Sequence, residues 1–137
     1  MADAVTTKVL FNGYRRYNAI FTNTSDGTGE SAVIKIDLST LTGPDRTPPT
    51  KFVIDEIIYD VNGFEGVKVL ADHTSAADQL LILLSGSGYH DFRSTGGLMT
   101  SVVSTDGPGD ILFTTVSTGA GASGDNYTIE IRGRLKD

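Results

Sequence analysis

The stretch that decides the fold is Tyr127-Thr-Ile-Glu-Ile-Arg-Gly-Arg-Leu135, close to the C-terminus. Its apolar residues, Tyr127, Ile129, Ile131 and Leu135, alternate with the polar residues Thr128, Glu130, Arg132 and Arg134. Successive side chains of a β-strand point to opposite faces, so a period of two predicts a strand with one face in the core and the other in solvent. We interpret Arg132, Arg134 and Lys136 as part of the solvated face, and a contact for an acidic partner is the alternative.

Working outward from this strand, similar short segments occur along nearly the whole chain. Strands are predicted at residues 8–11, 17–22, 34–38, 51–61, 66–71, 80–84, 89–92, 98–104 and 111–117. Turn-forming stretches rich in Gly, Asn and Asp separate them at intervals of about eight to twelve residues. We therefore expect an all-β, single-domain, antiparallel β-sandwich or barrel of about nine or ten short strands, with jelly-roll or Greek-key connections.

Several of these segments carry a more specific prediction. Residues 17–22 and 34–38 are expected to form a hairpin through the turn at Ser25–Gly29, and Asn62-Gly63 is expected to reverse the chain after strand 51–61. Strand 51–61 has apolar residues on both faces and is expected to be central and largely buried. The continuously apolar Leu80–Leu84 is predicted to be a fully buried strand, and 89–92 a short edge strand.

Two irregular segments stand out between the strands. Ser39–Pro49 holds three of the four prolines, and because proline cannot donate a hydrogen bond to a sheet, this segment is predicted to be a loop that crosses between strands or sheets. Residues 118–126 are a second long loop, rich in Gly and Ser. Loops and sheet edges of this kind are the parts with which a β-sandwich binds other molecules.

The length of 137 residues fits one domain, which we place at residues 8–137. Residues 1–7 are predicted to be an extended N-terminal arm that becomes ordered only against a neighbouring molecule, which is a route to oligomers by arm exchange.

Composition excludes several classes of protein. With 11 basic and 17 acidic residues the chain carries a net charge of −6, which disfavours nucleic acid as a partner. The N-terminus has neither the charged nor the apolar region of a signal peptide, and the longest apolar run, Leu80–Leu84, is too short to span a membrane, so we expect no membrane partner. The absence of Cys removes disulfides, thiolate nucleophiles and Cys-based zinc sites.

A search for ligand-binding motifs gives weak candidates only. His73 and His90 are the two histidines, they lack a metal-ligand spacing, and we predict that both are surface imidazoles. Asp26-Gly-Thr-Gly-Glu30 lacks the ligand pattern of a calcium loop and is predicted to be a turn. Gly119–Gly124 has no following helix with which to bind phosphate, and is predicted to be a hairpin tip. We therefore expect no cofactor and no metal.

The candidates for catalysis are equally weak. Gly86-Ser-Gly88 is too short for a nucleophile elbow, although composition alone leaves a Ser-His-Asp triad open. The acidic residues Asp55, Glu56 and Glu65 are expected to be scattered over faces that point in opposite directions. We predict that the protein has no catalytic residues and is not an enzyme.

Five segments, taken in order, point to a family. They are Phe11-Asn-Gly-Tyr-Arg-Arg-Tyr17, Phe21-Thr-Asn-Thr-Ser-Asp-Gly-Thr-Gly-Glu-Ser31, Tyr89-His-Asp-Phe-Arg93 with Gly96-Gly-Leu98, Gly109-Asp-Ile-Leu-Phe-Thr-Thr115 and Gly124-Asp-Asn-Tyr-Thr-Ile129. Over most of its length the chain resembles small virion structural proteins of tailed bacteriophages, of the capsid decoration or cement type.

The resemblance implies a role without catalysis. Such a protein would be made in the host cytoplasm, form trimers or other homo-oligomers, bind the major capsid protein on the outer face of the capsid, and stabilise the head. The resemblance assigns no partner-binding residues. The alternative is another virion component: a head–tail or tail-associated protein, or a receptor- or glycan-binding module on the same sandwich. A glycan site would usually need an exposed aromatic platform, for which a chain with no Trp and five Tyr has little material.

Overall fold

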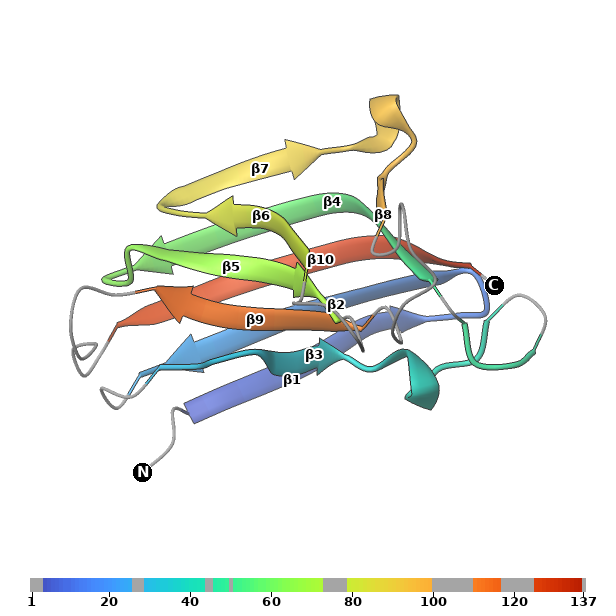
Figure 1. Ribbon diagram of the computed structural model, residues 1–137, viewed down its shortest axis with the longest axis horizontal. Coiled ribbons are helices and arrows are strands. Elements are labelled where there is room, and N and C mark those ends of the chain that lie inside the picture. The colour runs from blue at the N-terminus through green and yellow to red at the C-terminus, as the bar shows by residue number, and fades with distance from the viewer. Residues whose placement is uncertain are drawn as a thin grey trace.

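Two antiparallel β-sheets pack face to face around one apolar core in the computed structural model, which describes residues 4–25, 29–43, 46–49, 51–72, 79–99, 110–116 and 125–136 (Figure 1). The strands are β1 (Ala4–Asn12), β2 (Arg16–Thr24), β3 (Val33–Ile36), β4 (Lys51–Asn62), β5 (Gly66–Ala71), β6 (Gln79–Leu84), β7 (Ser87–Asp91), β8 (Leu98–Met99), β9 (Ile111–Val116) and β10 (Asn126–Lys136). Two short 3₁₀ helices, η1 (Leu38–Thr40) and η2 (Arg93–Thr95), follow β3 and β7. The first sheet has the order β1-β2-β10-β4-β7, with β8 also paired to β4, and the second has the order β3-β9-β5-β6. The prediction of an all-β antiparallel sandwich of about ten strands is confirmed.

The strand from which the sequence analysis began lies at the centre of the first sheet. β10 pairs with β2 on one side and with β4 on the other. Tyr127, Ile129, Ile131 and Leu135 are buried, as predicted from the alternation. Tyr127 and Phe21, from the first sheet, meet Phe113 of the second sheet edge-on, at ring-centre distances of 5.7 and 5.5 Å, so aromatic contacts join the two layers.

A bulge explains why β4 has apolar residues on both faces. Arg132 of β10 lies opposite Glu56, but the next residue, Gly133, lies opposite Ile54, so Asp55 is an extra residue in β4. Before the bulge Phe52 and Ile54 enter the core, and after it Ile57 and Val61 do. The prediction of a central, largely buried strand is confirmed.

The predicted hairpin between residues 17–22 and 34–38 is wrong. β2 belongs to the first sheet, where it pairs with β1 and β10, whereas β3 belongs to the second sheet and pairs with β9. The connection is held to β9, because the backbone N–H of Glu30 donates to Thr115 Oγ1 at 2.8 Å and the N–H of Thr115 donates to the Glu30 carbonyl at 3.1 Å. Turn residues specify that the chain bends, but not which sheet the next strand joins.

Most connections between consecutive strands cross from one sheet to the other, as the connection between β2 and β3 does. After Asn62-Gly63 the chain passes from β4 in the first sheet to β5 in the second, so this turn does not join two paired strands. The described parts of Ser39–Pro49 lead from β3 back to β4, and the prediction of a crossing loop is confirmed. The resulting pairs are nested, with β2 against β10, β3 against β9, β4 against β7 and β5 against β6.

The prediction that Leu80–Leu84 is fully buried is also wrong. β6 is an edge strand of the second sheet, and although Leu84 is buried, Leu80 and Leu83 are each 52% exposed. A continuous apolar run has no alternation that would show which residues point inward. In β6 the outward residues, Leu80 and Leu83, extend a row of apolar residues on the surface of the sheet. The short edge strand predicted at 89–92 is confirmed as β7.

The N-terminal strand is longer than predicted. Residues 4–7 do not form a separate arm but are continuous with β1 and pair with β2, from Ala4 opposite Thr24 onward. The boundary expected after residue 7 is therefore absent from the described part of the chain. Three predicted segments extend beyond the described residues: positions 100–104 of the strand 98–104, position 117 of the strand 111–117, and positions 118–124 of the second long loop, with its tip Gly119–Gly124.

Candidate functional site

The outer face of the second sheet carries an apolar row that crosses all four strands. Ile34 of β3 lies opposite Leu112 of β9, Leu112 lies opposite Leu70 of β5, and Leu70 lies opposite Leu80 of β6. Leu70 alternates with Val69 and Ala71, which are buried in the interior, so the row points away from the core. Ile34 and Leu80, at the two ends, are about half exposed, whereas Leu112 between them is almost fully buried. We call these four residues, together with Leu83, the apolar row.

The edge of the first sheet is a second exposed feature. All nine residues of β1 are exposed, and among the strands that the structure describes β1 pairs only with β2 (Figure 1). Val5 and Val9 lie opposite the buried Asn23 and Ala19, on the side of the strand that faces the core layer, yet each is 47% exposed. The second sheet therefore does not cover this strand. A register shift between Val9 and Phe11 makes Leu10 an extra residue.

The β1–β2 hairpin differs in charge from the rest of the molecule. Residues 4–24 include Lys8, Arg15 and Arg16 and no Asp or Glu, which gives them a charge of +3. Because the whole chain carries −6, the remaining residues together carry −9. All three basic residues are exposed.

Ion pairs cover the outer face of the first sheet. Glu56 accepts a hydrogen bond from Tyr89 Oη at 2.8 Å and lies 3.5 Å from Arg93 and 3.6 Å from Arg132. Hydrogen bonds from Arg93 lower the pKa of Asp91 to about 2. Arg93, Arg132 and Asp91 are exposed to water, so solvent screening limits the contribution of these pairs to stability, although the Glu56 side chain is only 13% exposed.

Two of the carboxylates named in the sequence analysis, Asp55 and Glu56, form ion pairs with arginines on this face. Arg134 Nε donates to both oxygens of Asp55, at 3.1 and 3.0 Å. Asp55 and Glu56 were expected to face opposite ways, but the bulge turns both toward the arginines of β10, and that expectation is wrong. Glu65 lies in the turn after β4 and has a bonding partner.

The histidines are not brought together in the described residues. His90 lies on β7, where its ring stacks on Tyr59 at 5.4 Å and on Phe92 at 6.0 Å. These rings cover part of His90, which remains partly exposed on the edge strand β7. His73 lies outside the described residues, as do positions 26–28 of the turn at Asp26–Glu30. Among the residues that the structure describes, no three His, Cys, Asp or Glu side chains are grouped so that they could hold a metal ion.

Two buried carboxylates have structural partners. Glu30 binds Lys35 Nζ at 2.5 Å and accepts a hydrogen bond from Tyr127 Oη, which ties the β2–β3 connection to β10. Asp110 Oδ1 accepts a hydrogen bond from the backbone N–H of Leu38 at 2.9 Å. Burial raises the pKa of Asp110, and the hydrogen bond from Leu38 opposes that shift.

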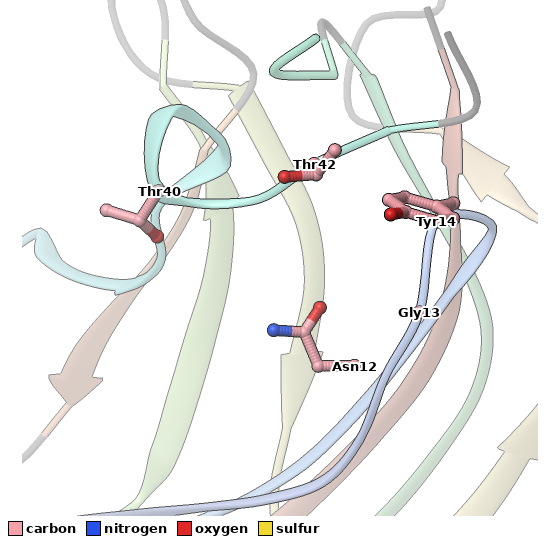
Figure 2. Close-up of a pocket in the computed structure, with 5 residues that line it drawn as sticks. All are labelled: Asn12, Gly13, Tyr14, Thr40 and Thr42. Carbon is pink, nitrogen blue, oxygen red and sulfur yellow. The ribbon is translucent and has the colours of Figure 1, made fainter. Parts of the chain in front are cut away.

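A pocket of about 390 Å³ lies where the β1–β2 turn approaches the segment after η1 (Figure 2). Its lining consists of Asn12, Gly13, Tyr14, Thr40 and Thr42, and Figure 2 shows the Asn12 amide projecting from the β1 end into the space beside the other side chains. Tyr14 is 55% exposed, and the Arg46 guanidinium lies 5.9 Å from the centre of its ring. Sequence reasoning missed this aromatic residue, although it directly follows the turn residue Gly13 in a basic segment.

A scan against protein-family models finds no match for the chain, and a search of curated proteins finds no significant match. Within the described ranges, no helix is both long and apolar enough to cross a membrane.

Proposed function

We propose that the protein is a phage virion structural protein of the capsid decoration type, which binds the outer face of the major capsid lattice and stabilises the head. The apolar row is the observation that carries this proposal. Large apolar side chains that remain exposed on a folded domain can mark surfaces that bind other proteins. In the apolar row these are Ile34, Leu80 and Leu83, each at least half exposed, whereas Leu112 between the two ends is covered. The row lies on a sheet, a rigid support that presents its side chains in a fixed register.

The order of the strands supports the same proposal. We infer that the sandwich is a jelly roll, because β2 to β7, β9 and β10 are paired as one long antiparallel hairpin folded into two four-stranded sheets. Jelly rolls occur in viral capsid domains, and also in lectins and cupins, so the fold agrees with a virion protein without identifying one.

The proposed mechanism is stabilisation by mass action. A protein that binds the closed lattice and not its ruptured form shifts the equilibrium toward the closed shell. Because many copies would bind each particle, contacts of modest strength would add up to a large effect. No step requires a catalytic residue, a cofactor or a metal.

Binding to purified capsids tests the proposal. The double variant Leu80→Asp, Leu83→Asp should fold, because both side chains are half exposed, but should no longer co-sediment with capsids that lack the native protein. Thr128→Asp, which adds a charge at an exposed position of β10 in the other sheet, is the matched control and should bind normally. Equal binding by the double variant would show that the apolar row does not contact the capsid.

Whole particles provide the second test. Virions that lack the protein should assemble but release their DNA at a lower temperature, and the protein should be nearly stoichiometric with the major capsid protein on a virion gel. A count of about a dozen copies or fewer per particle would instead favour a head–tail or tail component.

The pocket beside Tyr14 favours a second candidate, a glycan-binding module. Tyr14 supplies an exposed aromatic ring, while Asn12, Thr40 and Thr42 supply hydrogen-bonding groups around a space of suitable size for a sugar ring. If this candidate is right, the isolated protein should bind saccharides on a glycan array and Tyr14→Ala should abolish that binding. No binding by the wild-type protein would remove the candidate.

A further inference from the structure

We propose that the end of the molecule beside Tyr14 binds acidic saccharides, in which a sugar ring carries a carboxylate group. The proposal rests on the glycan-binding candidate above, which supplies an aromatic pocket of suitable size. It adds the class of sugar, which follows from the charged groups that the fold collects around this pocket.

Six of the 11 basic residues of the chain lie at this end of the molecule, which we call the basic end. Its members are Arg15, Arg16, Arg46, Lys51, Arg134 and Lys136. In the first sheet Arg16 of β2 lies opposite Arg134 of β10. Lys136 of β10 in turn lies opposite Lys51 of β4. A backbone hydrogen bond of 2.9 Å holds the β1–β2 turn against the end of β10, and Figure 1 shows the two side by side.

Most of these charges are not cancelled by neighbouring carboxylates. Arg134 is paired with Asp55. In contrast, Arg15, Arg16 and Arg46 form no ion pair within the described part of the chain, and all three are exposed. In a molecule whose net charge is −6, an exposed and unpaired basic surface attracts an anionic ligand locally.

A second cavity, of about 350 Å³, adjoins the Tyr14 pocket. Gly13 and Tyr14 line both cavities. The second is also lined by Phe11, Arg15 and Arg16, and among the described residues that line either cavity there is no Asp or Glu. Aromatic rings beside guanidinium groups suit a ligand that combines apolar faces with a negative charge. A sugar acid is such a ligand, because its ring C–H groups form the apolar faces and its carboxylate carries the charge.

Arg46 has a backbone conformation that favours a different residue. Its φ of 65° lies in the left-handed region, which glycine adopts without strain. The Arg46 N–H donates to the Gly43 carbonyl at 2.9 Å, and the Gly43 N–H donates to the Thr47 carbonyl at 2.8 Å, so the turn is fixed. The guanidinium carbon of Arg46 lies 5.9 Å from the centre of the Tyr14 ring. Strained residues cluster at ligand sites, and here the strained residue places a guanidinium beside the pocket.

The guanidinium accounts for the carboxylate. It is planar, and its N–H donors match the two oxygens of a carboxylate, so one arginine can bind a sugar acid through two parallel hydrogen bonds. Asn12 and Thr42 on the pocket wall can bind the sugar hydroxyl groups while the ring packs on Tyr14 (Figure 2). A neutral sugar would make only this second set of contacts.

Matched pairs of saccharides test the charge requirement. Isothermal titration calorimetry compares trigalacturonate with its methyl ester and 3′-sialyllactose with lactose, so uronic and sialic acids are tested separately. At least one acidic sugar should bind about tenfold more tightly than its neutral partner. Equal binding within both pairs would overturn the proposal and leave the glycan-binding candidate standing, whereas no binding of any of the four would remove both. Equally tight binding of single-stranded oligothymidylate would show a general polyanion site and would also overturn the proposal.

A charge substitution identifies the arginine. Arg46→Gln should weaken binding of the acidic sugar about tenfold and leave binding of its neutral partner unchanged. The matched control is Lys68→Gln, which removes the same charge from an exposed position of β5 in the second sheet and should change neither. Wild-type affinity of Arg46→Gln for the acidic sugar would show that the guanidinium does not belong to the site, and the proposal would fail.

Arg46→Gly separates binding from folding. Because glycine adopts a φ of 65° without strain, this variant should melt at the same temperature as the wild type or higher, while its affinity for the acidic sugar falls as it does in Arg46→Gln. A lower melting temperature with unchanged affinity would assign Arg46 a purely structural role and overturn the proposal. All these measurements use the isolated protein, so the capsid-binding proposal is judged by its own test.

Discussion

Gly133 is the residue at which the pairing of β10 and β4 slips by one position. A Cβ atom at this position would lie 2.4 Å from a ring carbon of Phe52 and 2.5 Å from the Val53 carbonyl oxygen. Real Cβ atoms do not approach backbone atoms so closely, so the bulge and the glycine depend on each other. In the sequence, Gly133 only interrupts the apolar face between Ile131 and Leu135.

We expect Gly133→Ala to lower the free energy of unfolding by about 1–3 kcal/mol, because the methyl group overpacks the core and the backbone beside it must move. Gly13→Ala is the control, since its Cβ would meet the exposed ring of Phe11, which can turn away. Urea denaturation of both variants measures the difference. Equal stability would mean that the bulge does not depend on Gly133.

The buried side chain of Asp110 should make the stability of the folded protein depend on pH. Burial raises the pKa of Asp110, so the folded state holds this proton more tightly than the unfolded state does. The contribution of Asp110 to stability therefore falls as the pH rises from the ordinary aspartate pKa of 3.8 through the higher folded pKa.

Asp110→Asn keeps an oxygen to accept the Leu38 N–H and removes the charge, so it should be at least as stable as the wild type at pH 7 and should lose this part of the pH dependence. Denaturation between pH 4 and pH 7 measures both effects. The control is Asp60→Asn, which removes the same charge from an exposed position. A variant that is less stable at pH 7 than this control would contradict the expectation.

At the scale of the element, strand existence was predictable and strand environment was not. The alternation of apolar and polar residues identifies β10, and apolar residues on both faces identify β4 as a central strand. Central strands have a paired strand on each side, so their sequences show these patterns regularly. β6 has a continuous run of apolar residues that suggests burial on both faces, yet it lies at an edge with Leu80 and Leu83 half exposed. Only its neighbours in space decide which of these residues are covered.

Two substitutions in β6 make this difference measurable. Leu84→Ala should lower the free energy of unfolding by about 2–5 kcal/mol, because Leu84 is fully buried and the change leaves a cavity. Leu80→Ala, at the exposed end of the apolar row, should change it by no more than about 0.5 kcal/mol. Thermal or urea unfolding of the two variants checks the prediction, and a large loss for Leu80→Ala would indicate that this end of the row is covered in the isolated protein.

At the scale of the whole molecule, charge is unevenly distributed. The hairpin of residues 4–24 carries +3 within a chain of net charge −6, and the composition alone does not reveal that the basic residues lie along one edge of a sheet. Exposed charges of opposite sign attract each other over roughly 10 Å at moderate ionic strength, and added salt shortens this range.

Self-association of the isolated protein should therefore weaken as salt is added. We expect the dissociation constant to rise several-fold between about 0.05 and 0.5 M NaCl, which analytical ultracentrifugation would measure. Leu80→Ala, which lies outside the basic hairpin and changes no charge, should show the same salt dependence as the wild type. Association that strengthens with salt would point to an apolar contact in place of the charged edge.

The sequence by itself determined the all-β class, the number of strands and the inward residues of β10, because alternation, turn residues and chain length depend on local chemistry. Tertiary structure alone decided which sheet each strand joins: β2 and β3 separate because Glu30 is bound to Thr115, Lys35 and Tyr127. It also turned Asp55 and Glu56 to one face, exposed Leu80 and Leu83 in the apolar row, and placed Tyr14 beside Asn12 and Thr42. These features arise from contacts between residues far apart in the chain, and no local pattern records such contacts.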